Sequence, residues 1–234
     1  MSELPVGQII CGDCREVMRG WPDGCFDAVV TDPPYGIGWT RGTWDDDPEQ
    51  YAELMRWLVA EANRVTGGGA VFVWQALPNL CHFHEWFPDG FRVFAACKGF
   101  VQYRPTPVQW SWDPVVFWGN IKCEEPSVYR KDFWVNDLAP FGAHRERIDH
   151  PCPKPEPTVA RVVSLACPPG GLVLDPFMGS GTTAVACVQT GRRFVGIELD
   201  PGYCEVARRR VAGALLQPRL DFEKATPPRQ EVLL

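Results

Sequence analysis

The segment Thr31-Asp32-Pro33-Pro34-Tyr35-Gly36 places a carboxylate, two prolines and an aromatic ring directly after an apolar run. An aromatic amine is a poor nucleophile because its lone pair is delocalised into the ring. Acceptors for both amine hydrogens favour a pyramidal nitrogen, and the Asp32 carboxylate and the Pro33 carbonyl can supply them. Pro34 helps to fix the backbone, and Tyr35 offers a face on which a base can stack. Alone, Asp-Pro-Pro is more often a rigid turn, but its context favours activation of an exocyclic amine.

A second motif, Leu172–Thr183, reads as a strand, a glycine-containing turn and the start of a helix. Gly179 and Gly181 allow backbone to approach a ligand closely, and a helix N-terminus offers N–H groups to a carboxylate. The next apolar run ends at Glu198, 19 positions after Gly179. That offset is close to the roughly 20 residues at which an acid meets ribose hydroxyls in nucleotide-binding folds. A tight packing turn would explain the glycines alone, but the whole arrangement indicates a nucleotide-like cofactor.

Short apolar runs alternate with helical patterns, which predicts a Rossmann-like α/β fold with a mostly parallel sheet. Asp47 is the expected N-cap of a helix that begins at Pro48 and ends before Gly67. The expected strands are Gln8–Cys11, Phe26–Thr31, Ala70–Trp74, Arg92–Ala96, Val115–Trp118, Leu172–Asp175 and Phe194–Glu198. The expected helices are Pro48–Thr66, Thr158–Ala166, Thr182–Thr190 and Pro201–Leu216.

The composition is that of an ordinary globular protein, with 234 residues of which 45% are hydrophobic and 22% charged. No apolar run is long enough to span a bilayer and the start lacks a signal-peptide pattern, so we expect a cytoplasmic protein without a membrane partner. The ten cysteines include one C-x-x-C, Cys11 to Cys14, without a matching second pair. We therefore expect reduced thiols and no metal site.

The net charge of −6 argues mildly against a nucleic-acid substrate. Between Arg92 and Arg161, however, basic residues slightly outnumber acidic ones. The middle of the chain therefore permits contact with phosphates without demonstrating it.

Together the motifs resemble those of the DNA amino-methyltransferases, which methylate adenine N6 or cytosine N4. The resemblance runs from Gln8 to about Leu216, and includes Asp13 before the catalytic strand and a His-Pro-x-x-Lys-Pro segment, here His150 to Pro155. In this chain the catalytic motif precedes the glycine turn. This order resembles that of the circularly permuted beta group of the family. Cys152-Pro153 departs from the usual Thr-Gln of that segment.

The resemblance implies an S-adenosylmethionine-dependent enzyme that flips a base from double-stranded DNA and methylates its amine by direct displacement. Asp at position 32 fits adenine N6 better than cytosine N4, which stays open as the alternative. The implied catalytic residues are Asp32, Pro33, Pro34 and Tyr35. The implied cofactor-binding residues are Asp13, Asp32, Lys154, Asp175, Pro176, Phe177, Gly179, Ser180, Gly181, Thr182 and Glu198.

We expect a single methyltransferase domain over residues 1–217, with residues 120–149 as a short target-recognition insertion and 218–234 as a C-terminal extension. Many relatives are dimers, so the resemblance also allows a homodimer. The expected DNA contacts combine one aromatic residue with basic side chains near the catalytic motif and in the insertion. They are Trp39, Arg41, Arg130, Lys131, Arg145 and Arg147, and a solvated charged loop would explain the last four equally well.

Three other classes of protein share part of this pattern. An RNA methyltransferase could use the same motif, although the permuted order favours DNA. A non-catalytic partner subunit would not need both motifs complete. A dinucleotide-dependent oxidoreductase would explain the glycine turn and Glu198 but leaves Asp32 to Tyr35 without a role.

Overall fold

The computed structural model describes residues 3–37, 47–102, 108, 110–121, 131–136 and 154–216. Its strands are β1 Ile9–Cys11, β2 Ala28–Thr31, β3 Ala70–Trp74, β4 Arg92–Gln102, β5 Trp110–Trp118, β6 Phe133–Asn136, β7 Leu172–Asp175 and β8 Arg193–Glu198. Its helices are α1 Cys14–Met18, α2 Pro48–Thr66, the 3-10 helix η1 Leu77–His82, α3 Phe83–Trp86, α4 Glu156–Ala166, α5 Thr182–Gln189 and α6 Pro201–Leu215.

The strands of the described residues form one eight-stranded sheet in the order β1-β8-β7-β2-β3-β5-β4-β6. The pairings of β5 with β3 and with β4 are antiparallel, and every other pairing is parallel. The predicted mostly parallel α/β fold is therefore confirmed. Within the described part of the chain, no helix has both the length and the apolar character needed to cross a bilayer.

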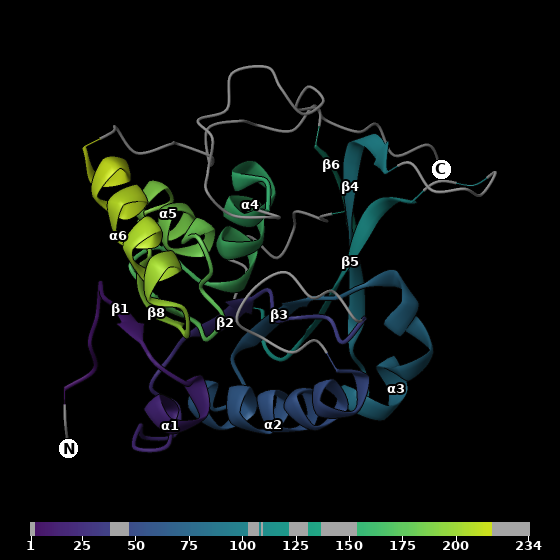
Figure 1. Cartoon of the computed structure of the whole chain (residues 1–234), viewed down its shortest axis with the longest axis horizontal. Coiled ribbons are helices and arrows are strands. Elements are labelled where there is room, and N and C mark those ends of the chain that lie inside the picture. Colours follow the sequence, from purple (N-terminus) through teal and green to yellow (C-terminus); the bar gives the residue numbers. More distant parts are fainter. Residues whose placement is uncertain are drawn as a thin grey trace, which may run out of the picture.

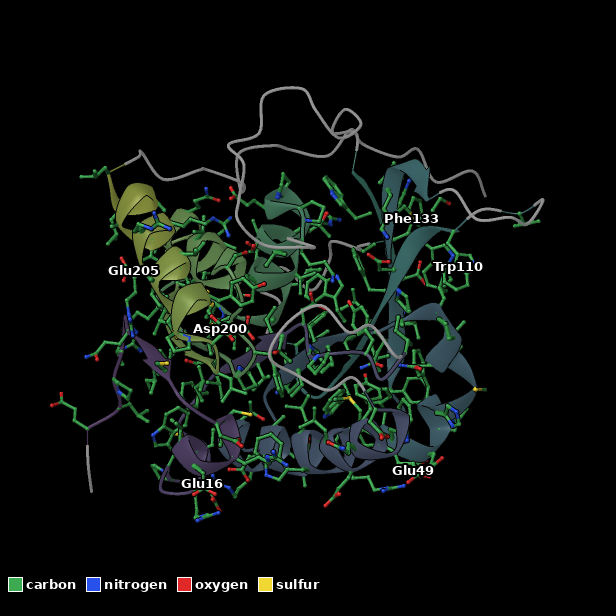
Figure 2. The ribbon with its side chains drawn as sticks, in the orientation of Figure 1. Glu16, Glu49, Trp110, Phe133, Asp200 and Glu205 are labelled. Atoms are coloured by element: carbon green, nitrogen blue, oxygen red, sulfur yellow. The ribbon has the colours of Figure 1, made fainter. Side chains whose placement is uncertain are left out.

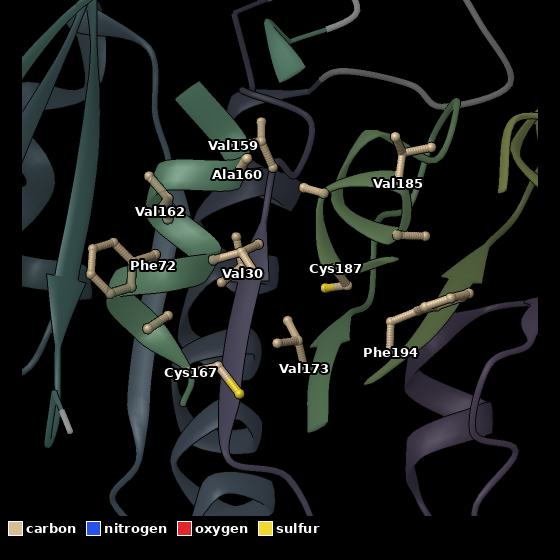
Figure 3. Packing of buried hydrophobic residues seen from close by; sticks show 14 of the residues in the cluster. Val30, Phe72, Val159, Ala160, Val162, Cys167, Val173, Val185, Cys187 and Phe194 are labelled. Atoms are coloured by element: carbon tan, nitrogen blue, oxygen red, sulfur yellow. The ribbon is translucent and has the colours of Figure 1, made fainter. Parts of the chain in front are cut away.

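Helices cover both faces of the sheet, with α1, α2 and α3 on one side and α4, α5 and α6 on the other (Figure 1). Side chains of β2 alternate between the two layers, since Val30 packs in the cluster with α4, α5 and α6 while Val29 packs in the cluster with α2. Figure 3 shows the first cluster, in which Val30 and Val173 of neighbouring strands lie near Cys187 of α5. Burial on both faces explains why the central strands read as continuous apolar runs.

The boundaries of α2 are set by residues that the sequence identifies. The Asp47 carboxylate accepts hydrogen bonds from the backbone N–H groups of Glu49 at 2.7 Å and of Gln50 at 3.4 Å, as expected of an N-cap. Gly67 ends the helix in the left-handed conformation with φ 58° and donates its N–H to the last turn. The predicted helix Pro48–Thr66 is confirmed at both ends.

The predicted strands and helices are all present, but β4 and β5 run further than expected, to Gln102 and from Trp110. The sequence pattern does not predict α1, η1, α3 or β6. Strand β6 lies in the predicted insertion, and among the described residues it pairs only with β4, at the edge of the sheet. Most of the predicted insertion and the whole C-terminal extension lie outside the described residues, so the domain limits stay a prediction.

Candidate active site

The two predicted motifs meet because β2 and β7 are neighbours in the sheet. They are parallel, with Ala28 opposite Val173 and Val29 opposite Leu174. The chain leaves β7 through α5 towards β8, and leaves β2 through α2 towards β3 on the opposite side. Such a reversal opens a crevice at the carboxyl ends of the strands, where ligands bind in open α/β sheets.

A buried hydrogen bond joins the two strand ends. The Thr31 hydroxyl donates to Asp175 Oδ1 at 2.6 Å, and both residues are almost fully buried. The backbone N–H of Phe177 donates to the same oxygen at 3.0 Å. Burial nevertheless raises the pKa of Asp175 to about 6, against hydrogen bonds from Thr183, Thr31 and the Phe177 backbone that lower it. This hydrogen bond therefore links the end of β2, which carries the catalytic motif, to the end of β7, which leads into the cofactor turn.

Asp32 lies between two donors. Its Oδ1 accepts the Tyr35 hydroxyl hydrogen at 2.5 Å, and its Oδ2 accepts from Lys154 Nζ at 2.5 Å. Lys154 also donates to the Tyr35 hydroxyl oxygen at 2.7 Å, and its ammonium lies 5.1 Å from the centre of the tyrosine ring. The Lys154 side chain is only 10% exposed. The structure therefore brings a cation into direct contact with the proposed catalytic acid.

Asn79 holds the backbone of the same motif, a role that the sequence pattern does not predict. It belongs to η1, immediately beyond β3, and its side chain is buried. Its Nδ2 donates to the Tyr35 carbonyl oxygen at 2.9 Å. An asparagine in a short helical segment carries no signal of this role, because only the tertiary fold places it beside Tyr35.

The glycine turn is fastened to the end of β8 by Glu198. Its Oε2 accepts the Gly179 N–H at 2.7 Å, and its Oε1 accepts the Asp200 N–H at 2.8 Å. Burial raises the pKa of Glu198 in spite of these two bonds. Gly181 has φ +87°, and a side chain there would lie 2.8 Å from the Cβ of Ala207 in α6, so this position requires glycine.

Half of the predicted catalytic and cofactor-binding residues line a cavity at the crevice. The predicted residues that line it are Asp32, Lys154, Asp175, Phe177, Gly179, Ser180 and Thr182, together with the unpredicted Trp74, Val159, Met178 and Thr183. Other predicted residues lie in the same segments, or are bonded to them, without lining it, namely Pro33, Pro34, Tyr35, Pro176, Gly181 and Glu198. Acid, cation and helix N-terminus thus face one space.

Asp13 lies apart from this cavity. Its carboxylate is the N-cap of α1, accepting the Arg15 N–H at 2.8 Å, and pairs with the Arg15 guanidinium at 3.2 Å. It lines a separate open hollow between α1 and α2, together with Arg15 and Trp57. A cofactor contact by Asp13 stays a prediction.

Of the predicted DNA contacts, Lys131 is described and exposed. It precedes β6, and its ammonium lies 5.2 Å from the centre of the Phe133 ring. Figure 2 shows Phe133 and Trp110 at the same end of the sheet, and both rings are partly exposed, 41% and 39%. The other predicted contacts lie outside the described residues, namely Trp39, Arg41, Arg130, Arg145 and Arg147. Of the His-Pro-x-x-Lys-Pro segment, Lys154 and Pro155 are described.

Known proteins resemble this chain in both sequence and fold. A family model described as DNA methylase, of the N6/N4 methyltransferase type, matches residues 103–209. The type II methyltransferase M.ScaI of Streptomyces caespitosus is 26% identical over 86% of this chain and 79% of its own length.

Among solved structures, the complex of M1.HpyAVI with SAM superposes with a TM-score of 0.67 and 24% identity, covering 87% of this chain and 98% of the other. The PvuII DNA methyltransferase, described as cytosine-N4-specific, superposes with a TM-score of 0.66 and 16% identity, covering 86% and 85%. These likenesses establish the fold. The matching family model and the type II methyltransferase relative support an N6/N4 DNA methyltransferase family for this chain.

Proposed function

We propose that this protein transfers a methyl group from S-adenosylmethionine to the exocyclic N6 amine of adenine in double-stranded DNA. The observation that carries the proposal is the meeting of Asp32 with the Gly179–Thr182 turn around one cavity. Asp32 can hold a target amine, and the glycine turn can hold a nucleotide-like cofactor. Their place around one cavity suits the transfer of a group from the cofactor to the amine. The type II methyltransferase relatives suggest a role in restriction and modification.

The residues around the cavity fit this cofactor. Its carboxylate would be held by the N-terminal turn of α5, and its ribose by Glu198, whose two oxygens keep lone pairs beyond those used by Gly179 and Asp200. Lys154 adds a positive charge on the same cavity. When bound, the cofactor supplies a methyl group on a positively charged sulfur, which leaves as the neutral thioether.

Asp32 and the Pro33 carbonyl would hold the two amine hydrogens of a flipped base, with the base stacked on Tyr35. Each Asp32 oxygen accepts one hydrogen bond in the described structure and keeps a further lone pair for an amine hydrogen. As the nitrogen gains the methyl group it becomes positively charged, and the Asp32 carboxylate stabilises that charge. The surplus proton then leaves the nitrogen through Asp32 to water.

Cytosine N4 is the second candidate, because its amine poses the same chemical problem and the superposable PvuII enzyme is described as cytosine-N4-specific. The family resemblance implies that an aspartate at position 32 fits adenine N6 better than cytosine N4. The test is to incubate the protein with labelled S-adenosylmethionine and unmethylated DNA, digest the DNA and separate the nucleosides. We expect label in N6-methyldeoxyadenosine; label only in N4-methyldeoxycytidine would reassign the base. Transfer to RNA but not to DNA would refute a DNA substrate.

A further inference from the structure

Arg210 of α6 lies beside the cofactor turn, and neither sequence motif includes it. Its Nη1 donates to the Ser180 carbonyl oxygen at 2.6 Å, to Ser180 Oγ at 3.1 Å and to Thr182 Oγ1 at 3.2 Å. Its Nη2 donates to Glu156 Oε1 at 2.6 Å, and the Arg210 side chain is only 14% exposed. One guanidinium therefore joins three segments that are distant in sequence.

The hydrogen bonds of Arg210 form two branches, one to Ser180 and Thr182 and the other to Glu156, and these lead to different segments of the active site. Ser180 and Thr182 flank Gly181, at the point where the cofactor turn passes into α5. Glu156 is the first residue of α4, two positions after Lys154, whose ammonium binds Asp32. Arg210 thus couples the position of the cofactor turn to the backbone that carries Lys154.

The hydrogen-bond directions also affect how the turn can bind a ligand. The Ser180 and Thr182 hydroxyl oxygens accept from Arg210, which leaves each O–H hydrogen available for donation. Both residues line the cavity. A hydroxyl that accepts from a cation is a stronger donor, and Arg210 adds positive charge near the N-terminus of α5. Both effects favour an anionic group in the cavity, such as the cofactor carboxylate.

We propose that Arg210 is a positioning residue for cofactor binding and methyl transfer, acting through the cofactor turn and through Glu156. The inference rests on the proposed function, because it concerns the same cavity and the same cofactor. A planar guanidinium is required, since its fork reaches both branches at once, whereas a lysine ammonium would keep the charge but reach one branch.

The experiment compares Arg210→Met and Arg210→Lys with two controls on the same helix. Arg209→Met removes a neighbouring exposed guanidinium. Val211→Ala removes buried apolar volume from the core cluster, and so reports what a general loss of stability does to binding. Binding of S-adenosylmethionine is measured by calorimetry, methyl transfer by KM and kcat, and stability by thermal unfolding.

We expect both Arg210 variants to weaken cofactor binding by about tenfold or more, the effect of losing hydrogen bonds to a charged group. kcat should fall as well, because the Lys154 backbone is no longer tied to the turn, while the KM for DNA stays at the wild-type value. The two controls should bind the cofactor as the wild type does.

Equal cofactor affinity in Arg210→Met and Arg209→Met would overturn the inference, and so would an equal loss of affinity in Val211→Ala. If Arg210→Met does not fold, Arg210→Lys and Glu156→Ala carry the test. The lysine keeps the charge but reaches only one branch, and Glu156→Ala removes the acceptor of the Glu156 branch. Failure of the wild type itself to bind S-adenosylmethionine would instead refute the proposed function. The wild-type measurement therefore separates the two failures.

Discussion

The Lys154 ammonium lies 2.5 Å from Asp32 Oδ2, and this contact joins residues 122 positions apart in the chain. Both side chains are largely shielded, with exposures of 10% and 30%. Asp32, which we propose to activate the target amine, therefore already accepts a hydrogen bond from the amine nitrogen of Lys154. A target amine must share the Asp32 carboxylate with Lys154 or displace it, so the two residues should be tested together.

Replacing Asp32 with alanine should abolish amine activation and lower the methyl-transfer rate by at least about a hundredfold, within the usual range for a positioned acid or base. Cofactor affinity should change little, because the glycine turn and Glu198 stay intact. Single-turnover transfer and calorimetric binding of S-adenosylmethionine measure the two effects separately. Transfer at the wild-type rate would remove Asp32 from the mechanism.

Replacing Lys154 with methionine should lower the transfer rate by about tenfold, which corresponds to roughly 1.4 kcal/mol, since Asp32 and Tyr35 lose a shared donor. The Asp32→Ala/Lys154→Met double variant should be no slower than Asp32→Ala alone, because Lys154 acts through Asp32. The double variant also shows whether the shielded ammonium destabilises Asp32→Ala. Additive losses in the double variant would mean that Lys154 acts independently, for instance on the cofactor.

Asn79→Ala should leave the Tyr35 carbonyl without its 2.9 Å donor in a largely buried place. Losing one hydrogen bond to a part-buried carbonyl costs about 1 kcal/mol, so the thermal midpoint should fall by a few degrees. The transfer rate should fall as well, with unchanged cofactor affinity, because the Asn79 side chain bonds the backbone of the catalytic motif. Leu80→Ala, at the neighbouring exposed position, is the matched control. Normal transfer by folded Asn79→Ala would show that the motif keeps its shape without this bond.

The elements that carry the two motifs are predictable from the sequence, because their signals are local. Asp47 and Gly67 bound α2 by their own hydrogen bonds, and the buried strands β2 and β7 read as apolar runs. Parallel strands followed by crossover helices place the loops that follow them at the same edge of the sheet. That rule predicts that Asp32 and the glycine turn lie at the same edge of the sheet, while the adjacency of β2 and β7 comes from the strand order that the structure shows.

Contacts that depend on how distant elements pack are not predictable in this way. Arg210 looks like one more basic residue in the helical run of Arg208 to Arg210, and the orientation of α6 alone decides that it meets Ser180 and Glu156. The family resemblance implies that Lys154 binds the cofactor, which stays a prediction, and Lys154 lines the cavity. The structure adds that its ammonium binds Asp32 and Tyr35. No spacing in the chain encodes that pairing.

Asp175 should make stability depend on pH in a way that Asp175→Asn removes. The folded-state pKa of about 6 is above the ordinary value of 3.8, so the folded protein holds this proton more tightly than the unfolded chain. The stabilisation is fully present below about pH 3.8 and is lost as the pH rises to about 6, a change of about 3 kcal/mol for the 2.2-unit difference.

Asparagine keeps an oxygen that can accept from Thr31 and from the Phe177 N–H, but it carries no charge to bury. Denaturant unfolding of both proteins should therefore show the variant gaining on the wild type by up to about 3 kcal/mol between about pH 4 and about pH 7. Taking the difference between the two proteins cancels the titration of every other group that the substitution leaves undisturbed. A difference that stays constant over this range would mean that Asp175 remains ionised in the folded protein, and that its hydrogen bonds outweigh its burial.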